Sequence, residues 1–185
     1  MELSIFVIFT ITMIVDILLI GGLIFTIYKP KYRIWPPPDK YSWQFWVTWA
    51  LAIISFSGTL LLTIVDWDNF IFKYRSRIPI GVLIIVLGLF LAVWGVKTLS
   101  LHSTLGLKGT LVTDGPYKYL RNPQYLADIL LFTGLLIIAN SLLVLIIGLL
   151  GILWNILTPF AEESWLREQF GDEYNEYCKK VKRFI

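Results

Sequence analysis

Five apolar stretches separated by polar segments make up most of the sequence. They predict membrane-spanning helices at about residues 3–28, 43–65, 78–99, 124–139 and 142–160. A helix needs about 20 apolar residues to cross a membrane, so the fourth stretch, at roughly 15, is short for a full span. Only Asn140 and Ser141 separate the last two stretches. Two apolar helices with so short a connection are expected to form a tight antiparallel hairpin.

The composition supports a membrane protein. Of the 185 residues, 57% are hydrophobic and 16% are charged, whereas a soluble domain is about 25% charged. The first stretch follows no basic segment and is too long for the apolar part of a signal peptide, so it is interpreted as the first span. We therefore predict an all-α, polytopic membrane protein with about five transmembrane helices in a single domain, residues 1–185. Residues 1–99 hold three N-terminal spans, and residues 100–185 hold a polar segment, the helical hairpin and a cytosolic tail.

The aromatic residues outside the spans predict contacts with the membrane surface. The tail carries apolar side chains at helical spacing, namely Trp165, Leu166, Phe170, Tyr174 and Tyr177. This spacing predicts a C-terminal amphipathic helix that lies along the membrane. Pro159, just before the tail, can kink the end of the last apolar helix and re-aim Glu162 and Glu163. Trp35 in the first loop is expected to be an interfacial aromatic residue.

The distribution of charge predicts the orientation in the membrane. Thirteen Lys and Arg residues fall in the first loop, the 97–121 segment and the tail, whereas Lys73, Arg75 and Arg77 fall on the opposite side. The positive-inside rule therefore places the N-terminus outside and the C-terminus in the cytosol. The net charge of +3 is too small to suggest a nucleic-acid partner. With one histidine, His102, and one cysteine, Cys178, no metal site and no intrachain disulfide are expected.

Two polar segments flank the hairpin, "GPYKYLRNPQY" at residues 115–125 and "PFAEESWLREQF" at residues 159–170. A tight hairpin returns both of its ends to one face of the membrane. The two segments are therefore expected to meet at the cytosolic boundary, where they would form the two halves of one site.

The first segment offers positive charge. Asn122 and Pro123 are predicted to be the N-cap and the first position of a helix. The free N–H groups of a helix N-terminus, with Arg121 beside them, suit a carboxylate. Tyr117 and Tyr125 supply flat faces and hydroxyl groups. Interfacial tyrosines with a helix cap also occur on many spans that have no site, so this alternative stays open.

The second segment offers negative charge. Glu162 and Glu163 end an apolar helix, and carboxylates beside hydrocarbon are costly and often functional. The alternative is that these acids begin a solvated amphipathic helix. Asp128, three residues after Tyr125, is expected to bind a cationic group or to act as a base. Asp16, deep in the first span, is expected to pair with a polar group of another helix.

Together the two halves suit a ligand with a carboxylate, a cationic centre and a flat base. S-adenosylmethionine has all three. NADPH also carries flat bases, but its phosphates would need several basic residues at once, and only Arg121 is expected in the pocket.

The C-terminal half resembles a known family. "GTLVTDGPYKYLRNPQY", the apolar hairpin and "EESWLREQFGDEYNEYCKKVKRF" are similar to the membrane methyltransferase superfamily, which includes isoprenylcysteine carboxyl methyltransferase and the phospholipid N-methyltransferases. The resemblance implies that S-adenosylmethionine lies in a pocket formed by the segment before the hairpin, the hairpin ends and the start of the tail. By position, it implies cofactor-binding roles for Gly109, Thr110, Leu111, Val112, Tyr117, Asn122, Pro123, Tyr125 and Glu162. Glu163, next to Glu162, is a further cofactor-binding candidate. It also implies that Arg121 is a positioning or electrostatic residue. With Asp128 and Tyr125, which share a helix face just inside the membrane, Arg121 completes the set of catalytic candidates.

Two positions depart from the family pattern. Asn122 stands where many relatives carry His, and Thr158 stands near the position of an arginine that binds the substrate carboxylate in prenylcysteine enzymes.

From the residues and the resemblance together, we expect an S-adenosylmethionine-dependent methyltransferase that acts on a lipophilic or lipid acceptor at the membrane–cytosol boundary. Amine, thiol, carboxylate and alcohol acceptors are all consistent with the sequence, which indicates no particular oligomeric state. The alternatives are an NADPH-dependent membrane reductase of the sterol reductase type and a non-catalytic scaffold.

Overall fold

The computed structural model describes residues 3–70 and 74–184, and every regular element in this part of the chain is helical. The long helices are α1 (Leu3–Tyr28), α2 (Trp43–Val65), α3 (Arg77–Leu99), α5 (Pro123–Ala139) and α6 (Leu142–Lys180). Three short elements lie between them: η1 (Pro30–Tyr32), α4 (Leu101–Thr104) and η2 (Gly115–Lys118). The predicted all-α fold is confirmed. Lys73, which the charge argument uses, lies outside the described residues.

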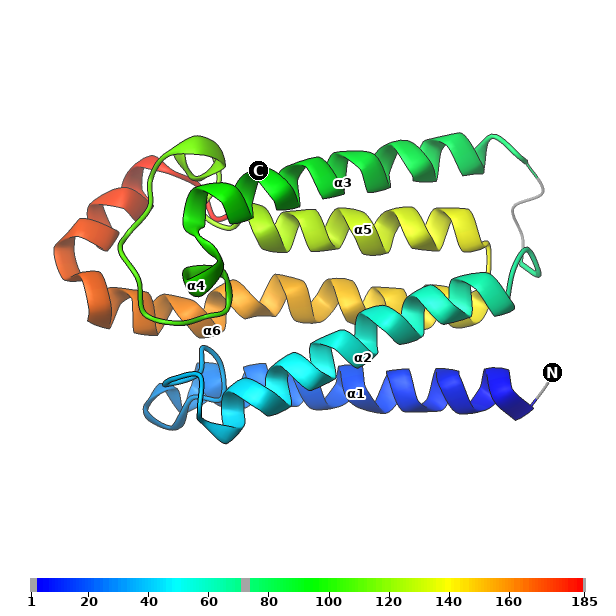
Figure 1. The fold of residues 1–185 in the computed structure, drawn as a ribbon, viewed down its shortest axis with the longest axis horizontal. Helices are drawn as coiled ribbons and strands as arrows, with labels where there is room; N and C mark the ends of the chain where they lie inside the picture. The colour runs from blue at the N-terminus through cyan, green and yellow to red at the C-terminus, as the bar shows by residue number, and fades with distance from the viewer. Residues whose placement is uncertain (1–2, 71–73, 185) are drawn as a thin grey trace.

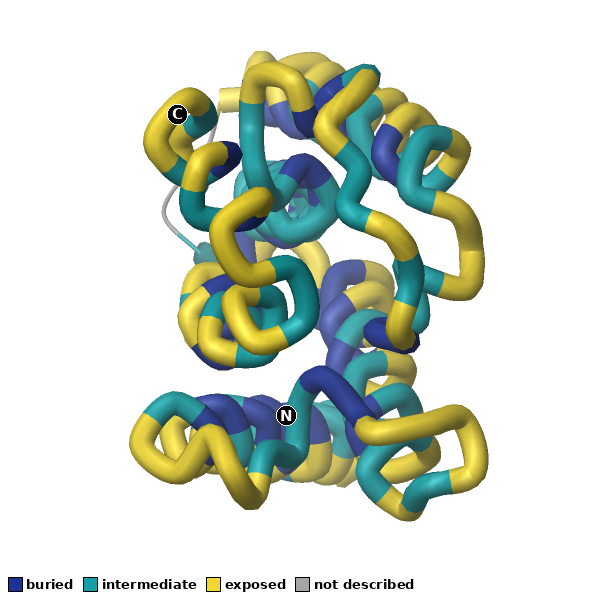
Figure 2. Tube along the Cα trace, turned by 90° about the vertical axis from the view of Figure 1, so that its left-hand side faces the viewer, coloured by how far each residue is buried: buried dark blue, intermediate teal, exposed yellow. Residues whose placement is uncertain are grey.

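Four of the helices, α1, α2, α3 and α6, are long and apolar enough to cross a membrane, and α5 is a shorter apolar helix of 17 residues. Large hydrophobic side chains such as Ile53, Leu83 and Phe90 are exposed on their outer faces, and Figure 2 shows exposed positions along the helices. This pattern is what a hydrocarbon environment requires, because lipid tails can cover apolar side chains.

The helices form one bundle (Figure 1). Helix α3 packs against α5, α5 against α6, α6 against α1, and α1 against α2. Glycines allow the close approach of α3 and α5: a Cβ atom at Gly81 would lie 2.4 Å from Ile138 Cγ1, and one at Gly134 would lie 2.5 Å from Ile85 Cγ1. Small residues commonly line such contacts between membrane helices.

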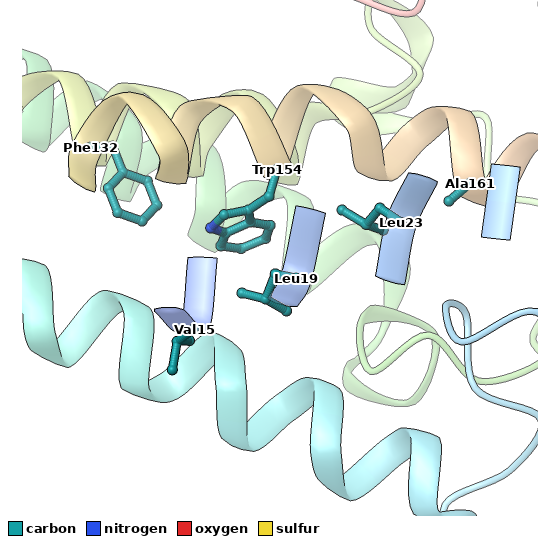
Figure 3. Close-up of a cluster of buried hydrophobic side chains, with 6 residues drawn as sticks. All are labelled: Val15, Leu19, Leu23, Phe132, Trp154 and Ala161. Atoms are coloured by element: carbon teal, nitrogen blue, oxygen red, sulfur yellow. The ribbon is translucent and has the colours of Figure 1, made fainter. Parts of the chain in front are cut away.

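The core lies between α1, α5 and α6. Figure 3 shows Phe132 of α5 and Trp154 of α6 facing the α1 residues Val15, Leu19 and Leu23. The rings of Phe132 and Trp154 meet edge to face with centroids 6.2 Å apart, a favourable arrangement for aromatic pairs.

Polar pairs lie between the helices as well. Ser55 of α2 donates a hydrogen bond of 2.6 Å to Asp16 Oδ1 of α1. The expected pairing of Asp16 with a polar group of another helix is therefore confirmed.

A polar cluster closes the end of the bundle that holds the α5–α6 turn. Asn140 adopts a left-handed conformation with φ 47°, and Ser141 caps α6 by accepting a hydrogen bond from Val144 N. The loop after α2 binds this turn. Asp68 forms an ion pair of 2.7 Å with Arg77 and accepts a hydrogen bond of 2.8 Å from Asn140 Nδ2. Asp66 accepts a hydrogen bond from Ser141 Oγ. We call Asp66, Asp68, Arg77, Asn140 and Ser141 the turn-end cluster. The predicted hairpin is confirmed, and this cluster holds its connection.

Helix α6 continues beyond the apolar arm into the tail. Pro159, where the sequence allowed a kink, lies inside α6, and the non-helical dihedral angles of α6, all of which is described, fall at Gly171, with φ 53° and ψ −126°. Glycine accommodates this conformation without a Cβ clash. The chain therefore turns back at Gly171 (Figure 1), and Lys182 then pairs with Leu120.

Candidate active site

A cavity lies at the opposite end of the bundle from the turn-end cluster. Its walls come from the loop between α3 and η2, from η2, from the first turn of α5 and from residues 162–177 of α6. The two polar segments that flank the hairpin therefore meet, because the hairpin returns its two ends to the same place (Figure 1).

Nine of the twelve candidate site residues predicted from the sequence line this cavity. The loop contributes Gly109, Thr110, Leu111 and Val112, and η2 contributes Tyr117. The hairpin ends contribute Arg121, Asn122, Tyr125 and Glu162.

Three other candidates do not line the cavity. Pro123 is buried at the first position of α5. Glu163 points to a group of arginines, as described below. Asp128 is partly exposed and lies one helical turn after Tyr125, with no hydrogen-bond or ion-pair partner within residues 3–70 and 74–184.

Glu162, which lines the cavity, is held by two hydrogen-bond donors. Trp35 Nε1 donates to Glu162 Oε1 at 2.6 Å, and the Tyr125 hydroxyl donates to the same oxygen. No hydrogen bond from the described residues reaches Glu162 Oε2. One oxygen therefore fixes the carboxylate, and the other remains available to a ligand.

Trp35 was predicted only as an interfacial aromatic residue, and its contacts show a second role. It lies in the loop after α1, where the backbone N–H of Ile34 is anchored to Thr26 Oγ1 at 2.9 Å. Its ring also approaches Gly106 so closely that a Cβ atom there would lie 2.8 Å from Trp35 Cη2. Trp35 therefore connects the N-terminal half of the chain to the cavity.

Glu163 forms a separate network with three arginines. Arg183 donates two hydrogen bonds to its carboxylate, from Nε to Oε1 at 2.7 Å and from Nη2 to Oε2 at 2.9 Å. Arg121 Nη1 lies 3.3 Å from Oε1, and Arg167 Nη2 lies 3.7 Å from Oε2. Hydrogen bonds to Glu163 raise the pKa of Arg183 above its usual value, so this guanidinium stays charged. We call these four residues the Glu163 network. It places the charge of Arg121 at the cavity wall.

Asn122 occupies the predicted N-cap position of α5, but its predicted capping role was wrong. Its side chain makes no cap hydrogen bond within the described chain, and Nδ2 instead donates to the Arg183 carbonyl at 3.1 Å. The backbone N–H of Arg121 likewise donates to the Lys182 carbonyl at 2.9 Å. The segment after α6 therefore binds the first polar segment directly.

Two further hydrogen bonds of the site had no clear signal in the sequence. Gln124 Nε2 donates to Thr104 Oγ1 at 2.8 Å, and Tyr177 OH donates to the Tyr117 carbonyl at 2.6 Å. Both contacts hold the loop against the helices. Burial is the largest cause that raises the pKa of Tyr117 well above its usual range, and the charge of Glu162 adds to it. Tyr117 is therefore a neutral phenol.

The aromatic face of the tail also contributes to the cavity. Trp165, Phe170 and Tyr174, whose spacing predicted contact with the membrane, line its wall. Flat side chains near a carboxylate and an arginine can hold a ligand that combines a planar ring with charged groups.

Comparisons with known proteins identify the relatives of this chain. The family model for phospholipid methyltransferases matches residues 76–173. The Protein-S-isoprenylcysteine O-methyltransferase of Schizosaccharomyces pombe is 36% identical over 74 residues, which cover 38% of this chain and 30% of that protein. The Phosphatidylethanolamine N-methyltransferase of Yarrowia lipolytica is 27% identical over 158 residues, which cover 76% of this chain and 16% of that protein.

A third relative carries a different name. The Cobalt-zinc-cadmium resistance protein CzcN of Cupriavidus metallidurans is 28% identical over 146 residues, which cover 77% of this chain and 61% of that protein. No solved structure gives a significant match. The chain spans less than two thirds of the length of each of these three relatives.

The reductase alternative gains no support from these relatives. The matched region begins next to α3, contains the cavity loop, the hairpin and Glu162, and covers more than half of the 185 residues. This chain therefore belongs to the phospholipid methyltransferase family.

Proposed function

We propose that the protein is a methyltransferase that uses S-adenosylmethionine and acts on a lipophilic acceptor at the membrane–cytosol boundary. The observation that carries the proposal is Glu162, whose Oε1 accepts two hydrogen bonds while Oε2 has no partner among the described residues of the cavity. A fixed carboxylate with one free oxygen suits an ammonium group.

The other groups of the cavity complement Glu162. Arg121 and the N-terminus of α5, which no side chain caps within residues 3–70 and 74–184, offer positive charge to a carboxylate. Tyr117, Trp165 and Phe170 offer flat faces to a base. The charged groups therefore fit the amino-acid part of S-adenosylmethionine, and the aromatic rings fit its adenine. Gly109 to Val112 would contribute main chain and side chains to the same pocket.

When bound, S-adenosylmethionine supplies an electrophilic methyl group. The chain itself contributes mainly by holding the cofactor and the acceptor in position, since aligning two reactants can lower the activation barrier by as much as about 7–11 kcal/mol. Arg121, fixed by the Glu163 network, keeps positive charge at the cavity wall. Asp128, partly exposed and without a partner in the described chain, takes up a proton from an amine acceptor or binds its cationic form.

The same arrangement supports the proposed orientation. The 97–121 segment and the tail line the cavity, and the first loop reaches it through the hydrogen bond from Trp35 to Glu162. These three segments carry thirteen of the sixteen Lys and Arg residues. The cavity end then faces the cytosol, from which a soluble cofactor enters, while an acceptor enters from the bilayer.

Binding of two cofactors to the purified protein tests the proposal. The full chain in detergent is titrated separately with S-adenosylmethionine and with NADPH, and we expect saturable binding of the first alone. Binding of NADPH alone would support the reductase, and binding of neither would support a scaffold. Radiolabelled methyl transfer to a total lipid extract, followed by identification of the labelled species, then gives the acceptor.

A further inference from the structure

A second hollow of about 370 Å³ lies beside the cavity. It forms where η1, just after α1, meets α6. The side chains that line it include Lys31, Arg33, Ser164, Trp165 and Glu168, and Trp165 also lines the cavity.

The two basic residues of this hollow are available to a ligand. Arg33 is held in place by a hydrogen bond of 3.0 Å from Nε to the Pro36 carbonyl, and its guanidinium carbon lies 6.0 Å from the centroid of the Trp165 ring. Neither Lys31 nor Arg33 forms an ion pair with any residue of the described chain. Arg33 therefore presents the remaining N–H groups of an oriented guanidinium.

The balance of charge favours an anion. Two cations share the hollow with a single acid, Glu168, and the Ser164 hydroxyl adds a neutral hydrogen-bond donor. Guanidinium and ammonium groups with a hydroxyl are the usual ligands of a phosphate group.

The position of the hollow favours a lipid over a soluble phosphate. It begins two residues beyond the end of α1, a candidate membrane span. On both sides of Lys31 the chain exposes aromatic rings, with Tyr28 at 79% and Tyr32 at 67% exposure. Amphipathic aromatic side chains at the end of a span are typical of the headgroup region of a membrane, and basic pockets there attract anionic lipids.

We propose that this hollow binds the phosphate headgroup of an anionic phospholipid that is not the methyl acceptor. The lipid phosphate contacts Arg33, Lys31 and Ser164, and its acyl chains extend along the apolar surface of α1. This binding does not depend on the proposed methyltransferase activity. Because Trp165 separates the two sites, the bound lipid also supports one wall of the cavity.

Native mass spectrometry of the full chain tests this proposal. Protein released from detergent micelles is titrated with phosphatidylglycerol, with phosphatidylcholine of the same acyl chains, and with glycerol 3-phosphate. We expect one phosphatidylglycerol to bind more tightly than either of the other two. The double variant Lys31→Ala/Arg33→Ala should weaken this binding about 25-fold, since each basic residue near a charged surface contributes roughly fivefold.

Matched variants make the outcome decisive. Lys179→Ala/Lys180→Ala removes the same charge from exposed positions that line neither hollow, and we expect it to change binding by less than about threefold. Lys31→Ala alone removes an exposed side chain and should cost about fivefold without affecting folding. Equal loss in both double variants, equal affinity for phosphatidylcholine, or equal affinity for glycerol 3-phosphate would overturn the proposal.

Discussion

The two ends of the helical bundle use the same kinds of side chain with different results. In the turn-end cluster, Asp66 and Asp68 are engaged by Ser141, Asn140 and Arg77, and none of these residues lines the cavity of the candidate active site. At the cavity end, both oxygens of Glu163 are likewise engaged, by Arg183 and Arg121, but Glu162 beside it has one oxygen without a partner among the described residues. A carboxylate with both oxygens engaged stabilises a connection, whereas one with a free oxygen can bind a ligand.

The largest expected effect is at Glu162. Glu162→Gln keeps the shape of the side chain but removes its charge, so we expect the affinity for S-adenosylmethionine to fall by about 100-fold or more, the range found when a buried charged partner is lost. Isothermal titration calorimetry measures this change.

The matched control is Glu176→Gln, which alters an exposed acid paired with Lys179. It should leave the affinity within about twofold, because exposed ion pairs contribute little. Equal behaviour of the two variants would contradict the assignment of Glu162.

A smaller effect is expected at Arg183, which contacts Glu163 and not the cavity. Arg183→Ala removes two hydrogen bonds from Glu163, so Arg121 loses part of its support. We expect a roughly tenfold loss of affinity for S-adenosylmethionine, typical of one charged hydrogen-bonding partner. Arg183→Lys should restore part of it, and a thermal melt separates this effect from unfolding. Unchanged affinity in Arg183→Ala would show that the network is not needed for binding.

The turn-end cluster should respond in stability and not in binding. Asp68→Ala removes the ion-pair partner of Arg77, which is only 8% exposed. We expect the free energy of unfolding to fall by about 1 kcal/mol, because Asp68 itself is half exposed. This corresponds to a melting temperature about 2–4 °C lower, with affinity for S-adenosylmethionine within twofold. Asp172→Ala, at an exposed position, should change neither quantity, and a loss of affinity in Asp68→Ala would remove the distinction between the two ends.

The smallest effect is expected at Tyr117. Its hydroxyl makes no hydrogen bond with the described residues, and its raised pKa keeps it neutral. Tyr117→Phe should therefore change the affinity by less than about threefold, whereas Tyr117→Ala should cost more, because it removes an aromatic wall. Titration of both variants with S-adenosylmethionine separates the contribution of the ring from that of the hydroxyl. A large loss of affinity in Tyr117→Phe would assign a direct role to the hydroxyl.

Much of the fold could be predicted from the sequence, because the apolar stretches and the two-residue turn at Asn140–Ser141 are local signals. The meeting of Arg121 and Glu162 at one cavity also follows from the hairpin, which brings both of its ends to one place. The different surroundings of Glu162 and Glu163 are consistent with helix geometry, because adjacent residues of a helix point about 100° apart.

The remaining features depend on contacts between distant parts of the chain. The partner of Glu162, Trp35, lies 127 residues away, and nothing in the first loop indicates which acid its indole N–H would meet. Asn122 has the local pattern of a cap, but a carbonyl 61 residues later competes for its amide. Pro159 is tolerated inside α6, and the bend falls at Gly171, where the chain needs a positive φ to return to Leu120.

The partners of the acid pair have a consequence for engineering. Trp35 and Arg183 both fall outside residues 76–173, the stretch that defines membership of the family. A minimal fragment cut to that stretch would retain both acids but lose the indole that orients one and the guanidinium that neutralises the other. Grafting the hairpin onto a foreign scaffold would therefore require substitutes for both donors, and changes confined to the flanking chain could retune the acids while every hairpin residue stayed the same.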